Sequence, residues 1–169
     1  MNNEVMEKLQ AIADGSGDGI KVTGRVQMWL NGELVLDKNN IVTTAGKNRL
    51  ATNILNASAA GNTFVGYMGF GTGTNAVGIA DTALQTELTA AVGYSRKSVT
   101  PSNPQANQIS YYAQLTGITS PVTVQEAGLF DVASLTAGTF TLCAHLLTGA
   151  VALNSSSDSL AVTWTISFT

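Results

Sequence analysis

The chain has 169 residues, of which 11% are charged and 44% apolar, and its formal net charge is −3. This length suits one domain with a sizeable core, and an acidic balance without a basic stripe argues against nucleic-acid binding. A single cysteine excludes an internal disulfide, and no run approaches the roughly 18 apolar residues of a membrane span. Because typical domains carry about 25% charge, we expect a chain that works inside an assembly.

Residues 1–20 are expected to form an arm and a hinge, and residues 21–169 a single domain. Four apolar residues of the arm recur at helical spacing and are our candidates for partner binding: Val5, Met6, Leu9 and Ile12. The run D-G-S-G-D-G at residues 14–19 predicts a flexible hinge. It also matches the first half of a calcium loop, but the twelfth position, which needs a bidentate acid, is Arg25. We therefore expect no metal there.

Alternating apolar and polar residues predict strands over most of the remaining chain. The expected strands cover residues 21–30, 33–37, 41–44, 63–70, 94–100, 108–115, 122–130, 138–147 and 159–169. Asn31-Gly32 predicts a tight hairpin turn, and Asn39-Asn40 and Gly149 predict further turns. In the last strand, five large apolar residues alternate with Ser, Ala and Thr, which places Trp164 in the core.

Two helical elements are expected among these strands. Apolar residues at helical spacing predict a helix over residues 45–57, and Asp81 is expected to cap a short helical turn that reaches Leu88. The elements together predict a mainly β fold. It is an antiparallel, jelly-roll-like β-sandwich of about eight or nine strands with one helix, a short helical turn and an N-terminal arm.

No motif in the sequence carries recognisable chemistry. Gly46-Lys47 lacks the preceding glycine of a phosphate loop, and G-F-G-T-G-T at residues 69–74 lacks the third glycine of a nucleotide fingerprint. Cys143 and His145, two positions apart, are expected on one strand face, where they could pair, but no third group orients the imidazole. We expect no catalytic residue, no cofactor and no metal, and thus no enzyme.

Glu126 is the carboxylate that stands out. Counting by two from Val122 aligns it with the core residues of its strand, and a buried carboxylate needs a partner. Arg96 and Lys97 are the candidates by residue type. We favour a structural pair over a general base with a raised pKa.

Several segments together resemble a diffuse class of tailed-bacteriophage virion proteins. They are N-N-I-V-T-T-A-G-K-N-R-L-A from residue 39, G-F-G-T-G-T, D-T-A-L-Q-T-E-L, an arginine, E-A-G-L-F-D, and the closing V-T-W-T-I-S-F. The resemblance implies a small antiparallel β-sandwich on a capsid or tail, without catalytic residues. It also implies that four polar residues hold the fold: Asp81, Glu87, Arg96 and Glu126. His145 departs from the arginine that the resemblance leads us to expect after Leu-Cys-Ala.

From these observations we expect a capsid cement (decoration) protein of the virion, assembled in the host cytoplasm. Its partners would be the major capsid protein and itself, as a homotrimer, with no nucleic acid and no membrane. The alternative in the same biology is a tail, baseplate or fibre-attachment protein. The alternative from another class is a carbohydrate-binding module, which needs an exposed aromatic platform. Its candidates are Trp29, Tyr94, Tyr111 and Tyr112.

Overall fold

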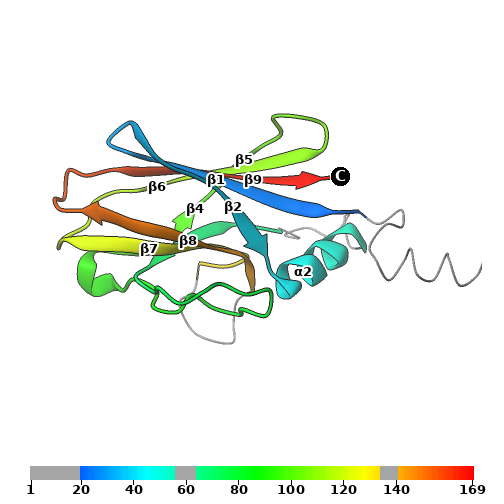
Figure 1. The fold of residues 1–169 in the computed structure, drawn as a ribbon, viewed down its shortest axis with the longest axis horizontal. Coiled ribbons are helices and arrows are strands. Elements are labelled where there is room, and N and C mark those ends of the chain that lie inside the picture. The colour runs from blue at the N-terminus through cyan, green and yellow to red at the C-terminus, as the bar shows by residue number, and fades with distance from the viewer. Residues whose placement is uncertain (1–19, 56–63, 134–140) are drawn as a thin grey trace, which may run out of the picture.

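The computed structural model describes residues 20–55, 64–133 and 141–169. Within these residues, nine strands form one antiparallel sheet in the order β4-β3-β7-β8-β2-β1-β9-β6-β5. The sheet folds over into two facing layers (Figure 1) and is nearly closed into a barrel, because β4 contacts β6 near the other end of the order. The predicted mainly β, antiparallel, sandwich-like fold is confirmed.

The first layer consists of β1 (Val22–Leu30), β9 (Leu160–Phe168), β6 (Gln108–Leu115) and β5 (Thr100–Ser102), with the first part of β2 (Glu33–Val42). β1 and β2 form the predicted hairpin, since Asn31 and Gly32 both have positive φ, at 52° and 91°. β9 lies between β1 and β6 over its whole length. This layer is therefore built around the strand that the sequence marks most clearly.

β2 passes from the first layer to the second, and the turn predicted at Asn39-Asn40 is wrong. Both asparagines stay paired with β1, and only the last two residues of β2 pair with β8. The Asn40 side chain accepts a hydrogen bond from Trp164 Nε1 at 3.0 Å. Gly24 leaves the room for it, because a Cβ there would lie 1.9 Å from Asn40 Oδ1.

The second layer consists of β3 (Tyr67–Gly71), β4 (Lys97–Ser98), β7 (Val122–Phe130) and β8 (Leu142–Leu153). The strand predicted over residues 94–100 is wrong in extent, since β4 and β5 divide this part of the chain between the two layers. A turn was predicted at Gly149, whose φ is 74°. This glycine lies instead at an irregularity inside β8, and the strand continues beyond it. Residues 138–140 of the predicted strand lie outside the described residues.

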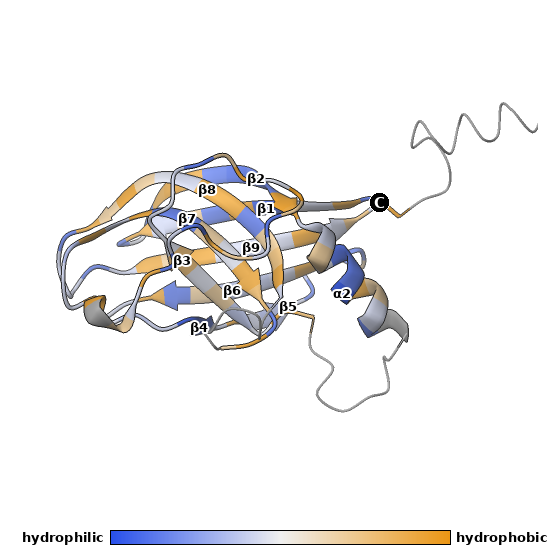
Figure 2. Cartoon of the chain, turned by 90° about the horizontal axis from the view of Figure 1, so that it is seen from below, coloured by the Kyte–Doolittle hydropathy of each residue, from blue (hydrophilic) through white to orange (hydrophobic). Residues whose placement is uncertain are grey.

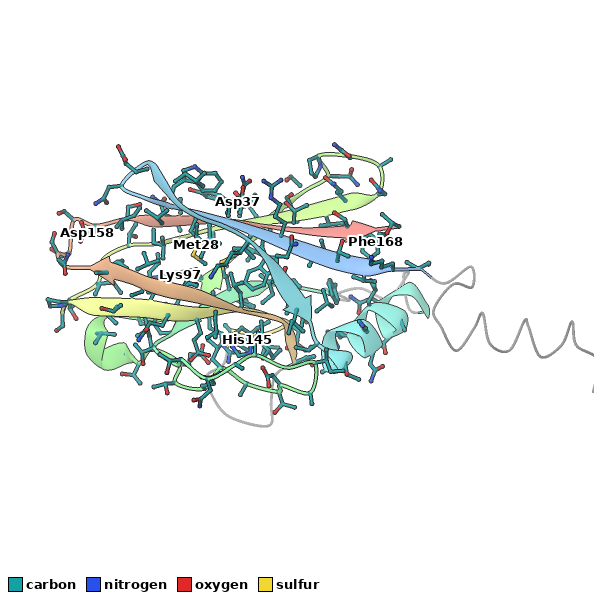
Figure 3. The ribbon with its side chains drawn as sticks, in the orientation of Figure 1. Met28, Asp37, Lys97, His145, Asp158 and Phe168 are labelled. Atoms are coloured by element: carbon teal, nitrogen blue, oxygen red, sulfur yellow. The ribbon has the colours of Figure 1, made fainter. Side chains whose placement is uncertain are left out.

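Apolar side chains from both layers meet in one core. Trp164 is fully buried, as predicted, and Met28 lies between the layers (Figure 3). The largest fully buried side chains include Phe70, Met68, Leu115, Leu129 and Leu160. Burial of each such side chain contributes about 1.5–3 kcal/mol, so this core is the main source of stability. Figure 2 shows the apolar residues concentrated along the strands.

The predicted helix is present as α2 (Thr44–Leu55), which packs against β8 at one end of the sandwich (Figure 1). It begins after Thr43, whose Oγ1 accepts a hydrogen bond from the backbone N–H of Gly46 at 2.9 Å. A Cβ on Gly46 would lie 2.0 Å from the carbonyl oxygen of Cys143, so this glycine allows the close approach. No helix in the described part of the chain is long and apolar enough to span a membrane.

Residues 72–88, here named the covering segment, lie against the outer side of the second layer (Figure 1). The helical turn predicted from Asp81 to Leu88 is wrong, because these residues are irregular and the short helix η1 (Ala90–Val92) follows them. The backbone N–H groups of Gln85 and Thr86 bond to a side chain of β7 instead of to helix carbonyls. The covering segment therefore depends on the sheet for its conformation.

Candidate functional site

The central part of the second layer is buried on both of its faces. Ala127, Leu129 and Ala144 face the main core, whereas Phe130 and Leu142 pack with Leu84 of the covering segment. Polar side chains on the outer face of β7 and β8 are thus enclosed beneath the covering segment. Figure 3 shows His145 on this side of the second layer.

β-bulges place Glu126 and His145 on this outer face. The register of β7 against β8 shifts between Val124 and Glu126, so Glu126 lies opposite to the face that counting from Val122 predicts. A second shift makes Cys143 an extra residue in β8, and its side chain joins the main core. The expectation that Cys143 and His145 share a face is therefore wrong.

Glu126 is fully buried, and four hydrogen bonds fill the acceptor positions of its carboxylate. Oε1 accepts from the backbone N–H groups of Gly73 at 3.0 Å and Thr86 at 2.7 Å. Oε2 accepts from the backbone N–H of Gln85 at 2.9 Å and lies 3.0 Å from His145 Nε2. The expected pairing of Glu126 with Arg96 or Lys97 is wrong, since His145 is its cationic partner.

His145 is fully buried between two carboxylates. Its Nδ1 lies 2.6 Å from Asp81 Oδ2, and its Nε2 contacts Glu126. Burial alone would lower the pKa of His145, but the hydrogen bonds to Glu126 and Asp81 outweigh burial and raise this pKa above its ordinary value. Each ring nitrogen faces a carboxylate oxygen, an arrangement that favours the doubly protonated imidazolium form of the ring.

The pKa of Glu126 moves in the opposite direction. Burial alone would raise it, but the hydrogen bonds from His145 and from the three backbone N–H groups lower it below its ordinary value. Asp81, His145 and Glu126 therefore form a charged triad that fastens the covering segment to β7 and β8.

This triad has no free site for acid–base chemistry. Both nitrogens of His145 are occupied by carboxylates, so the ring has no lone pair with which to activate a nucleophile. The Cys143 thiol contacts the carbonyl oxygens of Phe64 and Thr141, and burial raises its pKa to about 12. Among the described residues, no group of acids, histidine and cysteine is arranged to hold a metal ion. The geometry supports a structural role for the triad.

A second ion pair involves Glu87, near the C-terminal end of the covering segment. Arg96 Nε and Nη2 donate to the two oxygens of Glu87 at 2.7 and 2.8 Å, and Nη1 donates to the carbonyl of Val132. The guanidinium also stacks 3.5 Å above the centre of the Phe130 ring. Tyr94 bridges this pair to β3, because its hydroxyl donates to Glu87 and accepts from the N–H of Phe70.

The glycines of G-F-G-T-G-T make room for these two ionic clusters. A Cβ on Gly71 would lie 2.5 Å from Glu126 Oε1, and a Cβ on Gly73 would lie equally close to the same atom. A Cβ on Gly69 would lie 2.6 Å from the Phe130 ring and 3.0 Å from Glu87 Oε1. The glycine repeat thus serves close packing against buried carboxylates.

The triad predicts a pH dependence of stability. Because the pKa of His145 is raised in the folded chain, its contribution is complete below the ordinary value of about 6.5 and is lost as pH rises through the folded pKa. Because the pKa of Glu126 is lowered, its contribution is complete above about 4.5 and is lost as pH falls. Urea unfolding from pH 3 to 8.5 should show a maximum between these values, with a fall of up to about 1.4 kcal/mol per pH unit above it.

The control is the His145→Gln variant, whose stability should be nearly constant from pH 6.5 to 8.5. The Cys143 thiol and the buried tyrosines also have raised pKa values, so they make stability depend on pH as well. Their effect begins at higher pH, above the end of this range. Equal alkaline slopes for the variant and the parent protein would contradict the imidazolium assignment.

The outer face of the first layer is the second notable surface. Its central row comes from β9 and has only small side chains: Ala161, Thr163, Thr165 and Ser167. Arg25 and Asp37 pair with each other beside this row, with Arg25 Nε 2.7 Å from Asp37 Oδ1. No other charged residue lies opposite this row on the paired positions of β1 and β6. The middle of the face therefore has only small side chains, and the face is almost neutral.

One end of this face carries apolar side chains that are exposed or, in the case of Trp29, partly exposed. Trp29 pairs with Leu34 across the hairpin, and a bulge in β2 adds Val35 beside them. Leu34 is 54% and Val35 45% exposed, and Tyr112 on β6 is 43% exposed. We name these four residues the hairpin patch. Of the four aromatic residues considered for a sugar platform, Trp29 and Tyr112 lie here, whereas Tyr94 and Tyr111 are buried.

The structure brings Asp81, Glu87, Arg96 and Glu126 together along the covering segment, in two clusters. The partner-binding candidates Val5, Met6, Leu9 and Ile12 lie outside the described residues. Sequence reasoning missed His145 as the partner of Glu126. A usable signal was present, since Glu126 and His145 lie in two apolar strands that follow each other in the sequence, and each needs a buried partner.

No protein-family model matches the chain, and comparisons with curated protein sequences and with solved structures found no match either.

Proposed function

We propose that the protein is a cement protein of a tailed-bacteriophage capsid, which binds the outer face of the major capsid shell as a homotrimer. The observation that carries this proposal is the nearly neutral outer face of the first layer with the hairpin patch at one end. Exposed aromatic and aliphatic side chains on an uncharged surface are typical of protein interfaces. Many weakly bound copies would stabilise a shell through multivalency.

The placement of the resembling motifs also supports the proposal. Asp81 and Glu87 belong to the covering segment and bond to His145 and Arg96, and Glu126 accepts hydrogen bonds from the backbone of the same segment. This is the fold-holding role that the resemblance implies. It leaves the outer face of the first layer, on the other side of the sandwich, free for binding.

Removal of the aromatic side chains from the hairpin patch should weaken binding to capsids. The double variant Trp29→Ala, Tyr112→Ala should lose about 2 kcal/mol or more of binding free energy, which is roughly 30-fold in Kd, because aromatic residues dominate interface energetics. Binding would be measured by co-sedimentation with purified shells that lack the protein. Ile79→Ala is the matched control, since Ile79 is 60% exposed but lies on the covering segment. Equal binding by the parent chain and both variants would contradict the role of this face.

Electron microscopy of labelled virions separates this proposal from a place in the tail. Label over the whole capsid surface supports a cement protein, whereas label at one vertex supports a tail, baseplate or fibre-attachment protein.

The hairpin patch favours one further candidate function. Trp29 and Tyr112 flank a row of small hydroxylic side chains, and aromatic rings beside hydrogen-bonding groups are the chemistry that binds sugars. A glycan array would detect this activity. A signal that is lost in Trp29→Ala would support a carbohydrate-binding module over a cement protein.

A further inference from the structure

An apolar groove opens between the start of β1 and α2, at the end of the sandwich where the C-terminus also lies (Figure 1). Its volume is about 480 Å³. Four apolar and two basic residues line it: Ile20, Val22, Leu50, Ala51, Lys21 and Lys47. Ile20 is 74% exposed, so an apolar wall of this groove faces solvent. A surface of this kind is suited to an apolar segment that also carries acidic side chains.

The segment that precedes Ile20 in the sequence has this chemistry. Residues 1–13 contain the four apolar residues at helical spacing, Val5, Met6, Leu9 and Ile12. Residues 1–13 carry Glu4 and Glu7 against Lys8, a charge of −1, and the tether at residues 14–19 adds Asp14 and Asp18. The groove supplies Lys21 and Lys47. Segment and groove are therefore complementary in both hydrophobicity and charge.

The connection between them is short. Residues 14–19 alternate polar residues with three glycines and end at Ile20, which is itself part of the groove wall. Six residues span at most about 20 Å when extended, so the end of residues 1–13 that joins this tether stays within that distance of the groove. A short tether of this kind gives a millimolar effective concentration, which favours the groove of the same chain over that of a second copy.

We propose that residues 1–13 dock in the groove of their own chain. Their apolar side chains cover Ile20, Val22 and Leu50, and their acidic side chains lie near Lys21 and Lys47. This contact goes beyond the proposed function, because it belongs to the free protein. Docking would keep the apolar residues of the arm covered until a partner with higher affinity displaces the arm from the groove.

Disulfide trapping tests this contact in the full chain. In a Cys143→Ala background, Leu9→Cys and Leu50→Cys should form an intramolecular disulfide under mild oxidation at micromolar concentration, seen as a monomer on non-reducing gels and as a linked peptide by mass spectrometry. The matched control replaces Leu50→Cys by Ser156→Cys. Ser156 is exposed, and its loop, marked by Asp158 in Figure 3, lies at the opposite end of the sandwich. Equal linkage in both pairs, linkage between copies, or no linkage would overturn the proposal.

Hydrogen exchange on the protein without new cysteines gives an independent readout. The amides of residues 4–12 should exchange at least tenfold more slowly in the parent chain than in the Lys21→Glu, Lys47→Glu double variant, whose reversed charges repel the arm. Full exchange of these amides in the parent chain would refute docking. Neither experiment involves capsids, so a failure here is distinguishable from a failure of the cement function.

Discussion

Glu126→Gln is expected to lower the free energy of unfolding by about 3–5 kcal/mol, although the two side chains have nearly the same shape. Four donors point at the Glu126 carboxylate, and three of them are backbone N–H groups that cannot rearrange without moving the covering segment. The amide has one acceptor oxygen, so its NH₂ group would face donors. His145 would also lose its buried counter-ion on β7. Urea unfolding at pH 6 measures the change.

Asp37→Asn is the control for this prediction, because it makes the same chemical change in the exposed Arg25–Asp37 pair. Its stability should stay close to that of the parent protein, since exposed ion pairs contribute little. If Glu126→Gln were destabilised by less than about 1 kcal/mol, the carboxylate would not be what fastens the covering segment.

The strands were predictable where one face is buried and the other is not. In β9, the residues at every second position from Leu160 to Ile166 are buried and those between them are partly exposed, which is the alternation that the sequence shows. β7 and β8 differ, because Glu126 to Phe130 and Leu142 to Leu146 are buried without a break. Residues 72–88 bury the outer face of these two strands, in addition to the face that the main core buries. The pattern within a strand carries no information about a segment that packs on it from elsewhere in the chain.

Bulges account for the errors in which face a residue occupies. Counting by two assumes an uninterrupted ladder, and each bulge reverses the count after it. The shift before Glu126 moved this residue to the outer face. The bulge at Cys143 placed the side chains of Cys143 and His145 on different faces of β8. Asn39-Asn40 shows a different failure. Its turn propensity was outweighed by the hydrogen bond from Trp164 and by the space at Gly24, both of which depend on β1 and β9.

The partners of the buried charges were the least predictable part of the site. Residue type alone gave Arg96 and Lys97 as the candidate partners of Glu126, because a buried carboxylate needs a cation. The choice is made by the path of the covering segment, which brings Glu87 to Arg96 and Asp81 to His145. A segment without regular structure has no periodicity from which such a path could be read.

Arg96→Leu is expected to lower the free energy of unfolding by about 2–4 kcal/mol. Leucine keeps apolar contact with the Phe130 ring but removes both hydrogen bonds to Glu87 and the one to Val132. The Glu87 carboxylate, which is only 15% exposed, would keep the hydrogen bond from the Tyr94 hydroxyl but lose its cation. Thermal unfolding and urea unfolding at pH 6 should both report the loss.

The double variant Glu87→Leu, Arg96→Leu decides whether that loss comes from the unpaired charge. A buried carboxylate without its cation costs much more than two apolar side chains that pack together, so the double variant should be more stable than Arg96→Leu alone. The coupling energy from the double-mutant cycle should reach at least about 1 kcal/mol, as is usual for residues in direct contact. A double variant whose destabilisation equals the sum of the two single ones would mean that Arg96 acts through its stacking on Phe130 and not through Glu87. In that case, of the two ionic clusters, the triad of Asp81, His145 and Glu126 would be the one that fastens the covering segment.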